Sequence, residues 1–211
     1  EVGQAQLGAA LRQLPGGEQV RVQRIRRAAA GAQARGVREE RRFAGPVGAF
    51  SSLQDLAGKR IMITAGGTQE PIDPVRYLGN HSSGKQGIAL ADEASKRGAL
   101  VTLVAANVSE PIPALHKVIR VATAAELSAA IDSKLNEVDA VVMAAAVADF
   151  RVEAAAQTKL KRSELGEEIS LKLVANPDIL AGIVSRVHTE GLQLRTVGFA
   201  AETADNASDL Q

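Results

Sequence analysis

Residues 60–87, RIMITAGGTQEPIDPVRYLGNHSSGKQG, constrain the fold of this chain more than any other segment. The segment opens with an apolar, β-prone run, which predicts a buried strand. The turn at residues 65–68 is Ala-Gly-Gly-Thr, and its small side chains allow a ligand to approach the backbone closely. A polar loop then leads to Asn-His-Ser-Ser-Gly-Lys at residues 80–85, where a helical pattern begins. Since a helix N-terminus favours negative charge, the segment predicts a binding site for an anion such as phosphate.

The rest of the chain alternates strands with helices. A helix is predicted over residues 84–98, with Arg97 among the side chains that face solvent. Further helices are predicted from a capping box that starts at Thr123, and from Asn176 as N-cap with Pro177 at the first helical position. This alternation predicts an α/β, Rossmann-like three-layer fold with a mainly parallel sheet. Apolar runs predict its later strands at residues 100–105, 117–121, 140–144, 168–174 and 195–199.

Ligands of parallel sheets bind beyond the carboxyl ends of the strands, where the strand order reverses. Three loops that follow strands are therefore expected near one another, at residues 65–84, 105–113 and 145–161. The third loop presents Asp149 after a run of tiny residues. This carboxylate alone could cap a helix or lie on the surface, but at a strand end it could accept from a base amino group or hold a cation. The Lys-Leu-Lys-Arg run at residues 159–162 is typical of a solvated loop, but folded over a phosphate site it could neutralise a triphosphate.

Two well-known nucleotide-binding motifs are not matched. Residues 79–86 nearly follow the pattern G-x-x-x-x-G-K-[ST], but Gln86 stands where a magnesium-binding hydroxyl is needed. No G-x-G-x-x-G fingerprint follows the first predicted strand, which weakens the alternative of an NAD(P)-dependent reductase. Ser82 and Ser83 could also do no more than cap a helix. The amide, two hydroxyls and lysine beside a glycine turn favour the anion site instead.

Composition excludes several other functions. The chain has no cysteine, so a catalytic thiol, a disulfide framework and thiolate zinc sites are excluded. Its three histidines are scattered, which argues against a histidine metal cluster. Aromatic residues make up 2% of the chain, so stacking on nucleic-acid bases is not expected. No apolar run is long enough for a membrane span and no signal-peptide pattern begins the sequence, so a cytoplasmic protein is expected.

Residues 1–50 differ from the rest in composition. They carry nine Arg and four Glu and are rich in Gly and Ala. We predict a basic arm or linker that is disordered, with short helical pieces considered at residues 7–14 and 20–34. A basic arm for nucleic acid or an acidic partner is the alternative. Residues 51–211 are expected to form the Rossmann-like domain.

Several motifs together resemble one enzyme family. ITAGGTQEPIDPVRYLGNHSSGKQG, AAAVADFR, KLKR, NPDIL and VGFAAET occur over about residues 55–205, in an order and spacing that resemble phosphopantothenoylcysteine synthetase. The resemblance implies CTP-dependent ligation of 4′-phosphopantothenate with cysteine in coenzyme A biosynthesis. The substrate carboxylate would attack the α-phosphate of CTP to give an acyl-cytidylate, and the cysteine amine would then displace CMP. In bacteria this synthetase is usually the C-terminal half of a bifunctional protein with a flavin-dependent decarboxylase, which residues 1–50 do not resemble.

The resemblance also implies roles for individual residues. Asn80 would act in turnover of the acyl-cytidylate and Lys159 would act on the nucleotide, so these two would be catalytic. Arg76, with Asn80, would bind phosphopantothenate. Mg²⁺ would bridge the triphosphate, with Asp149 as a candidate ligand. The implied nucleotide-binding residues are Gly66, Gly67, Ser82, Ser83, Gly84, Ala145, Ala146, Asp149, Lys159, Lys161 and Phe199, with Arg162 in support.

The family pattern bears on assembly and completeness as well. The family is dimeric, so a homodimer is expected. Its members continue well beyond the GFAAET motif, so we expect this chain to be a C-terminally truncated form of the domain. The alternative function is therefore a non-catalytic, nucleotide-binding fragment of the same enzyme.

Overall fold

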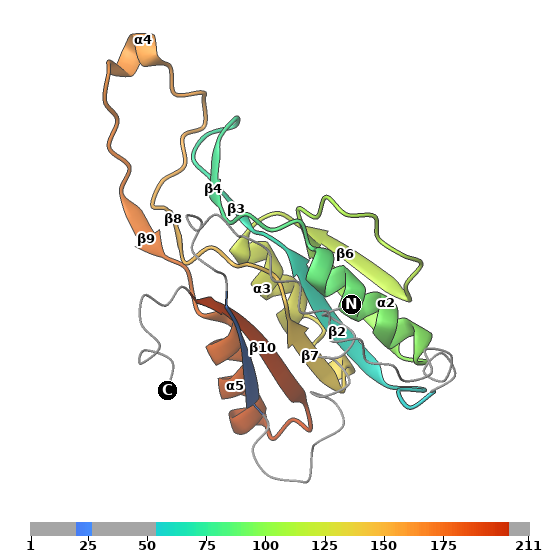
Figure 1. The fold of residues 1–211 in the computed structure, drawn as a ribbon. Helices are drawn as coiled ribbons and strands as arrows, with labels where there is room; N and C mark the ends of the chain where they lie inside the picture. The colour runs from blue at the N-terminus through green and yellow to red at the C-terminus, as the bar shows by residue number, and fades with distance from the viewer. Residues whose placement is uncertain (1–19, 27–53, 203–211) are drawn as a thin grey trace.

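The structure is a computed structural model that describes residues 20–26 and 54–202 (Figure 1). Its centre is a six-stranded sheet in the order β1-β10-β7-β2-β5-β6, and every neighbouring pair in it is parallel. This arrangement confirms the predicted α/β fold with a mainly parallel sheet. The strands are β1 Val20–Arg26, β2 Arg60–Gly66, β5 Leu100–Ala106, β6 Lys117–Val121, β7 Ala140–Met143 and β10 Arg195–Glu202.

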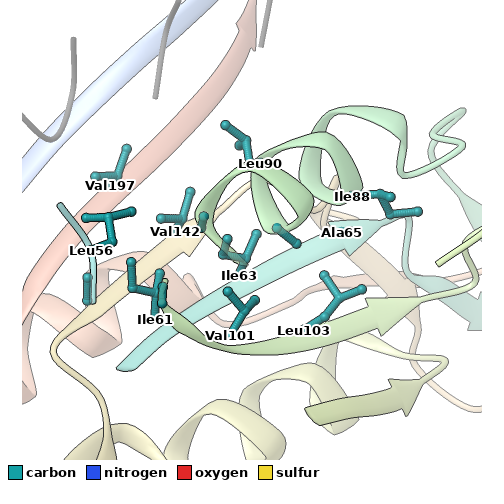
Figure 2. Close-up of a cluster of buried hydrophobic side chains, with 14 of the residues drawn as sticks. Leu56, Ile61, Ile63, Ala65, Ile88, Leu90, Val101, Leu103, Val142 and Val197 are labelled. Atoms are coloured by element: carbon teal, nitrogen blue, oxygen red, sulfur yellow. The ribbon is translucent and has the colours of Figure 1, made fainter. Parts of the chain in front are cut away.

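Helices cover both faces of the sheet. Side chains along β2 alternate, so Ile61 and Ile63 pack in the cluster beneath α2 (Figure 2). Met62, between them, packs in the cluster beneath α3 and α5. Both clusters are fully apolar, which explains why the central strands read as continuous hydrophobic runs. The helices are α2 Lys85–Lys96, α3 Ala124–Asp132, a short 3₁₀ turn Leu135–Glu137, and α5 Ile179–Glu190. In residues 20–26 and 54–202, no helix combines the length and apolar content that crossing a membrane requires.

Two antiparallel hairpins extend from the carboxyl side of the sheet. β3 Gln69–Pro71 pairs with β4 Tyr77–Gly79, and we call residues 69–79 the β3–β4 hairpin. β8 Phe150–Val152 pairs with β9 Leu173–Ala175, and residues 150–175 form what we call the arm. The short helix α4 Arg162–Leu165 lies at the tip of the arm, away from the sheet (Figure 1).

Three local predictions are wrong, each because of contacts distant in sequence. The strand expected at residues 168–174 is only β9, since the exposed residues before it have no neighbouring strand. Asn176 does not cap α5, because its side-chain oxygen accepts from Arg151 Nη1 at 3.2 Å and its side-chain nitrogen donates to the Ala148 carbonyl at 2.8 Å. Asp178 is the cap and accepts from the Ala181 N–H at 2.9 Å. Arg97 is not solvent-facing but 6% exposed, and its guanidinium binds Asp55.

The N-terminal region departs from the sequence analysis at one point. Residues 20–26 form strand β1, which pairs in parallel with β10, and not part of a helical piece at residues 20–34. The helical piece expected at residues 7–14 lies outside the described residues. The division into a basic N-terminal segment at residues 1–50 and a Rossmann-like domain at residues 51–211 stays a prediction. This N-terminal segment is distinct from the arm of residues 150–175.

Candidate functional site

The strand order reverses at β2. From β2 the chain runs outward through β5 and β6, then crosses back to β7 on the other side of β2. The loops after β2 and β7 meet there, because the Ala146 N–H donates to the Gly66 carbonyl at 2.8 Å and the Thr68 N–H donates to the Ala146 carbonyl at 3.1 Å. This is the position at which open parallel sheets bind their ligands.

A third loop joins them through Asn107, a residue that sequence reasoning missed. Asn107 follows β5 and has a left-handed backbone with φ 47°. Its side-chain amide donates to the Gly67 carbonyl at 3.0 Å and to the Ala122 carbonyl at 2.9 Å. The three loops expected near one another are therefore held together. An Asn directly after a strand was the available signal, since Asn tolerates this conformation.

The two glycines after β2 provide space. A Cβ on Gly66, which has φ 90°, would lie 1.9 Å from the Ala106 carbonyl oxygen. The Gly67 N–H already donates to that same carbonyl at 2.9 Å. The N–H of Gly67 is thus not a free donor for phosphate in this structure, and these glycines allow the loops to pack closely.

Free donors lie instead at the start of α2. Gly84 has φ 86° and no side chain caps the helix, although the Lys85 N–H reaches Ser83 Oγ at 3.3 Å. The first turn of a helix has N–H groups without intrahelical acceptors, and the helix dipole makes this end positive. A cavity of about 220 Å³ opens here, lined by His81, Ser82, Ser83, Gly84, Lys85, Gln86, Gly87 and Ala144.

The cavity brings together three of the predicted nucleotide-binding residues, Ser82, Ser83 and Gly84. It adds the amino group of Lys85, which sequence reasoning placed in the motif without giving it a role. Gly87 on the first turn lies against the sheet, since a Cβ there would be 2.6 Å from both Ala65 Cβ and the Thr64 carbonyl oxygen. The start of α2 is therefore fixed close to the end of β2.

Buried threonines shape the loop after β7. Thr64 Oγ1 accepts from the N–H groups of Ala144 and Ala145 at 3.1 and 3.0 Å. Thr68 Oγ1 accepts from the Ala148 N–H at 2.9 Å. Both threonines are 0% exposed, so these bonds are shielded from water. Sequence reasoning missed them, although a threonine in an otherwise apolar strand was a usable signal.

Asn80 and Asp149 flank this loop. The Asn80 amide donates to the Val147 carbonyl at 3.0 Å, which attaches Asn80 to the loop after β7. Asp149 is exposed, and its carbonyl accepts from the Asn176 N–H at 2.7 Å. Within the described residues no group of three or more His, Cys, Asp or Glu could hold a metal ion. One exposed carboxylate still fits Mg²⁺, which takes most of its ligands from phosphate oxygens and water.

Arg76 lies in a separate group on the turn of the β3–β4 hairpin. Its guanidinium bonds to Asp73, which is 4% exposed, and donates to the Leu160 carbonyl at 2.8 Å. The hydrogen bond with Arg76 is the main cause that holds the pKa of Asp73 well below its usual value. The Leu160 N–H also donates to Asp73, so the loop that carries Lys159 is attached to the turn of the β3–β4 hairpin. This turn lies past the three residue pairs that join β3 to β4.

The basic residues of the Lys-Leu-Lys-Arg run differ in their surroundings. Lys161 bonds to Glu164 at 3.1 Å and Arg162 bonds to Glu167, both near the tip of the arm. Lys159 is exposed, and in the described part of the chain no hydrogen bond or ion pair holds its ammonium group. The structure therefore leaves Lys159 available for an anion, but none of Lys159, Lys161 and Arg162 lines the cavity at the start of α2.

Phe199 also lies apart from the cavity. It is half-buried and packs against the hydrophobic cluster beneath α2. Its ring does not line the cavity at the start of α2. Ala145 and Ala146 do not line it either, but they lie beside it at the end of β7, next to Ala144.

A family model for the C-terminal domain of the DNA/pantothenate metabolism flavoprotein matches residues 56–210. The chain belongs to this family. Over 155 residues it is 46% identical to the coenzyme A biosynthesis bifunctional protein CoaBC of Escherichia coli K12, covering 73% of this chain and 37% of that protein. Over 159 residues it is 47% identical to CoaBC of Mycobacterium tuberculosis H37Rv, covering 74% of this chain and 38% of that protein.

A solved structure agrees with this membership. The crystal structure of the C-terminal domain of CoaBC superposes with a TM-score of 0.60 at 35% identity, covering 74% of this chain and 70% of that one. The family resemblance read from the motifs and the α/β fold are both confirmed. The chain spans little more than a third of the length of the curated relatives it matches.

Proposed function

We propose that this chain carries out the CTP-dependent ligation of 4′-phosphopantothenate with cysteine in coenzyme A biosynthesis. The observation that carries the proposal is the cavity at the start of α2, which opens between the loops after β2 and β7. Identity of 46% to CoaBC over the segment that forms these loops supports it. The alternative of an NAD(P)-dependent reductase is disfavoured, because the first βα turn has no dinucleotide fingerprint.

In the first step, an oxygen of the substrate carboxylate attacks the α-phosphorus of CTP. The bond from this phosphorus to the bridging oxygen breaks, and pyrophosphate leaves as the acyl-cytidylate forms. The N–H groups of the first turn of α2, the hydroxyls of Ser82 and Ser83, and the amino group of Lys85 would hold the phosphates. A carboxylate is already ionised at neutral pH, so positioning and charge stabilisation are needed more than a base.

The cytosine would be read at the end of β7. Thr64 Oγ1 accepts from the Ala145 N–H, and the Ala146 N–H donates to the Gly66 carbonyl, so this backbone is fixed. The backbone carbonyls of Ala145 and Ala146 would therefore be the groups that accept from the base, and a fixed backbone can discriminate by hydrogen bonding. The Asp149 carboxylate would accept from the cytosine amino group and is also the candidate ligand for Mg²⁺. Mg²⁺, when bound, would supply neutralisation of the triphosphate charge.

In the second step, the amine of cysteine attacks the acyl carbonyl carbon. The carbon–oxygen bond to CMP breaks, the amide forms, and the amine releases a proton. The Asn80 side chain would donate to the acyl oxygen as negative charge develops on it. Arg76 and Lys159 would bind anionic groups of phosphopantothenate and nucleotide, and Lys161 is proposed to assist from the arm.

Partners and location are part of the same proposal. The arm exposes Phe150, Ile169, Leu171 and Leu173, and apolar side chains on a projecting hairpin suit the interface of a homodimer. A flavin-dependent decarboxylase is the proposed functional partner, since the relatives are named bifunctional. We place this chemistry in the cytoplasm.

The test is release of pyrophosphate and CMP from CTP, Mg²⁺ and phosphopantothenate, with and without cysteine. The purified chain would run beside Asn80→Asp and Lys159→Gln. Cysteine-dependent CMP release that is lost in both variants supports the ligase and both residue roles. CTP binding without pyrophosphate release would instead favour the alternative of a non-catalytic nucleotide-binding fragment.

A further inference from the structure

We infer that Asp73 is a positioning residue that attaches the loop of Lys159 to the β3–β4 hairpin, so that Lys159 and Arg76 face the same anionic substrate. The inference rests on the proposed function for its catalytic consequence. Its structural part, the attachment of Leu160 by Asp73, stands on hydrogen bonds within the chain. Asp73 itself touches no reacting atom in this account and acts through the cations that it holds in place.

Asp73 is surrounded by donors. Its Oδ1 accepts from the N–H groups of Val75 and Arg76, both at 2.8 Å. Its Oδ2 accepts from Arg76 Nε at 3.0 Å, from Arg76 Nη2, and from the Leu160 N–H at 3.1 Å. The side chain is fully shielded from solvent, and charge-assisted bonds of this kind are the strong ones.

The first two of these bonds are local and would be found in many turns that begin with Asp. The bond to Leu160 is different, because the two residues lie 87 positions apart. Arg76 reinforces it by donating to the Leu160 carbonyl at 2.8 Å. Nearby, the Ala156 N–H donates to the Ile72 carbonyl at 2.9 Å, so the loop follows the hairpin over several residues. A carboxylate that only stabilises the turn at residues 73–76 would not also bind the loop that contains Leu160.

The attachment has a consequence for charge. Lys159 directly precedes Leu160, so fixing the Leu160 backbone fixes the origin of the Lys159 side chain next to Arg76. The Arg76 side chain remains 47% exposed although it is paired, so it can still face a ligand. Two cations from segments far apart in sequence are thus presented together. Without Asp73, the Arg76 guanidinium would lose its carboxylate partner and the Leu160 N–H would lose its acceptor.

The experiment compares Asp73→Asn, Lys159→Gln and the double variant in the full chain. The matched control is Asp139→Asn, because Asp139 makes the same kind of pair at the opposite end of the sheet. It accepts from the Arg60 N–H at 2.8 Å and from Arg60 Nη2 at 2.9 Å. The first readout is hydrogen exchange of the Leu160 amide, with tryptic cleavage after Lys159 as the second. The third is kcat/KM for ligation, and thermal unfolding is followed throughout.

We expect Asp73→Asn to speed exchange at Leu160 and cleavage after Lys159 by about tenfold, because the amide loses a charged acceptor. The Asp139→Asn control should leave both unchanged at a similar melting temperature. We also expect kcat/KM to fall by about tenfold in Asp73→Asn but by less than about twofold when Asp73→Asn is added to Lys159→Gln, since coupled residues are not additive.

Three results would overturn the inference. One is unchanged exchange at Leu160, and another is full multiplication of the two activity losses in the double variant. The third is exchange that rises equally across the whole domain, which would mean that Asp73→Asn only destabilises the fold. A chain that makes no product in its wild-type form would contradict the proposed function, while exchange and cleavage would still decide whether Asp73 holds the loop.

Discussion

At the level of single residues, most side chains at this site act on the backbone of a neighbouring loop. Thr64 fixes the N–H groups of Ala144 and Ala145, and Asn107 holds the carbonyls of two other loops. Such side chains build the site without touching a ligand. They fix the backbone of loops made of glycine and alanine, whose own side chains are too small to do so.

Replacing Thr64 with Val tests this view. Valine has nearly the same shape, but it leaves the N–H groups of the half-buried Ala144 and Ala145 without their acceptor, at a cost of about 1–3 kcal/mol each. We expect the free energy of unfolding in urea to fall by about 2–6 kcal/mol on that basis. Thr64→Ser keeps the hydroxyl and loses a methyl group, so it should lose only about 1 kcal/mol. Equal stability of the two variants would contradict the role given to the hydroxyl.

At the level of elements, α2 serves both the core and the site. Its inner face packs on β2 and β5 (Figure 2), and its first turn lines the cavity. Gly87 allows both, because it brings the helix within contact of Ala65. The position of the anion site thus depends on how closely this helix approaches the sheet.

Substituting two helical glycines, Gly87 and Gly182, distinguishes the effect of close helix–sheet packing from the effect of helix propensity. Gly87→Ala would place a Cβ 2.6 Å from Ala65 Cβ, so the helix must move away, and we expect a loss of about 1–3 kcal/mol. Gly182→Ala in α5 meets no atom within 4 Å and should gain about 0.5–1 kcal/mol. Chemical unfolding of the two variants measures both values. Stabilisation by Gly87→Ala would refute the close approach.

At the level of the whole molecule, the sheet and its helices form a body from which the arm projects (Figure 1). The arm residues Ile169 and Leu171 are exposed although they are apolar, which is unusual for a hairpin that stands away from the core. A second copy of the chain is the proposed cover. The body, in contrast, buries most of its large apolar side chains in two clusters.

If the arm forms the proposed dimer interface, a charged substitution in the arm should halve the molecular mass of the particle in solution. Leu171→Asp puts a charge among the apolar residues of the arm, so we expect a shift from dimer to monomer in light scattering after size-exclusion chromatography. Leu100→Asp changes another exposed leucine, at the start of β5 on the body, and should leave the dimer intact. A wild-type chain that is monomeric at high concentration would argue against the homodimer.

The sequence was informative where the signal is local. Apolar runs located the parallel strands from β2 to β10 but not β1, and the small-residue turns located the loops at their carboxyl ends. It failed where a residue's partner is distant, as for Arg97 with Asp55, which lies 42 positions away, and Asn176 with Ala148, 28 positions away. No local pattern reveals that such a side chain is already engaged. The same limit hid the attachment of Lys159 to the β3–β4 hairpin.

The most direct test of the central claim is a titration of the isotope-labelled chain with CTP and Mg²⁺, followed by amide chemical shifts. We predict saturable shifts at residues 82–87 and 145–149, the start of α2 and the loop after β7. Amides at the opposite end of the sheet, near Asp139, should not move. Shifts confined to other surfaces, or none at saturating nucleotide, would contradict a nucleotide site between these loops.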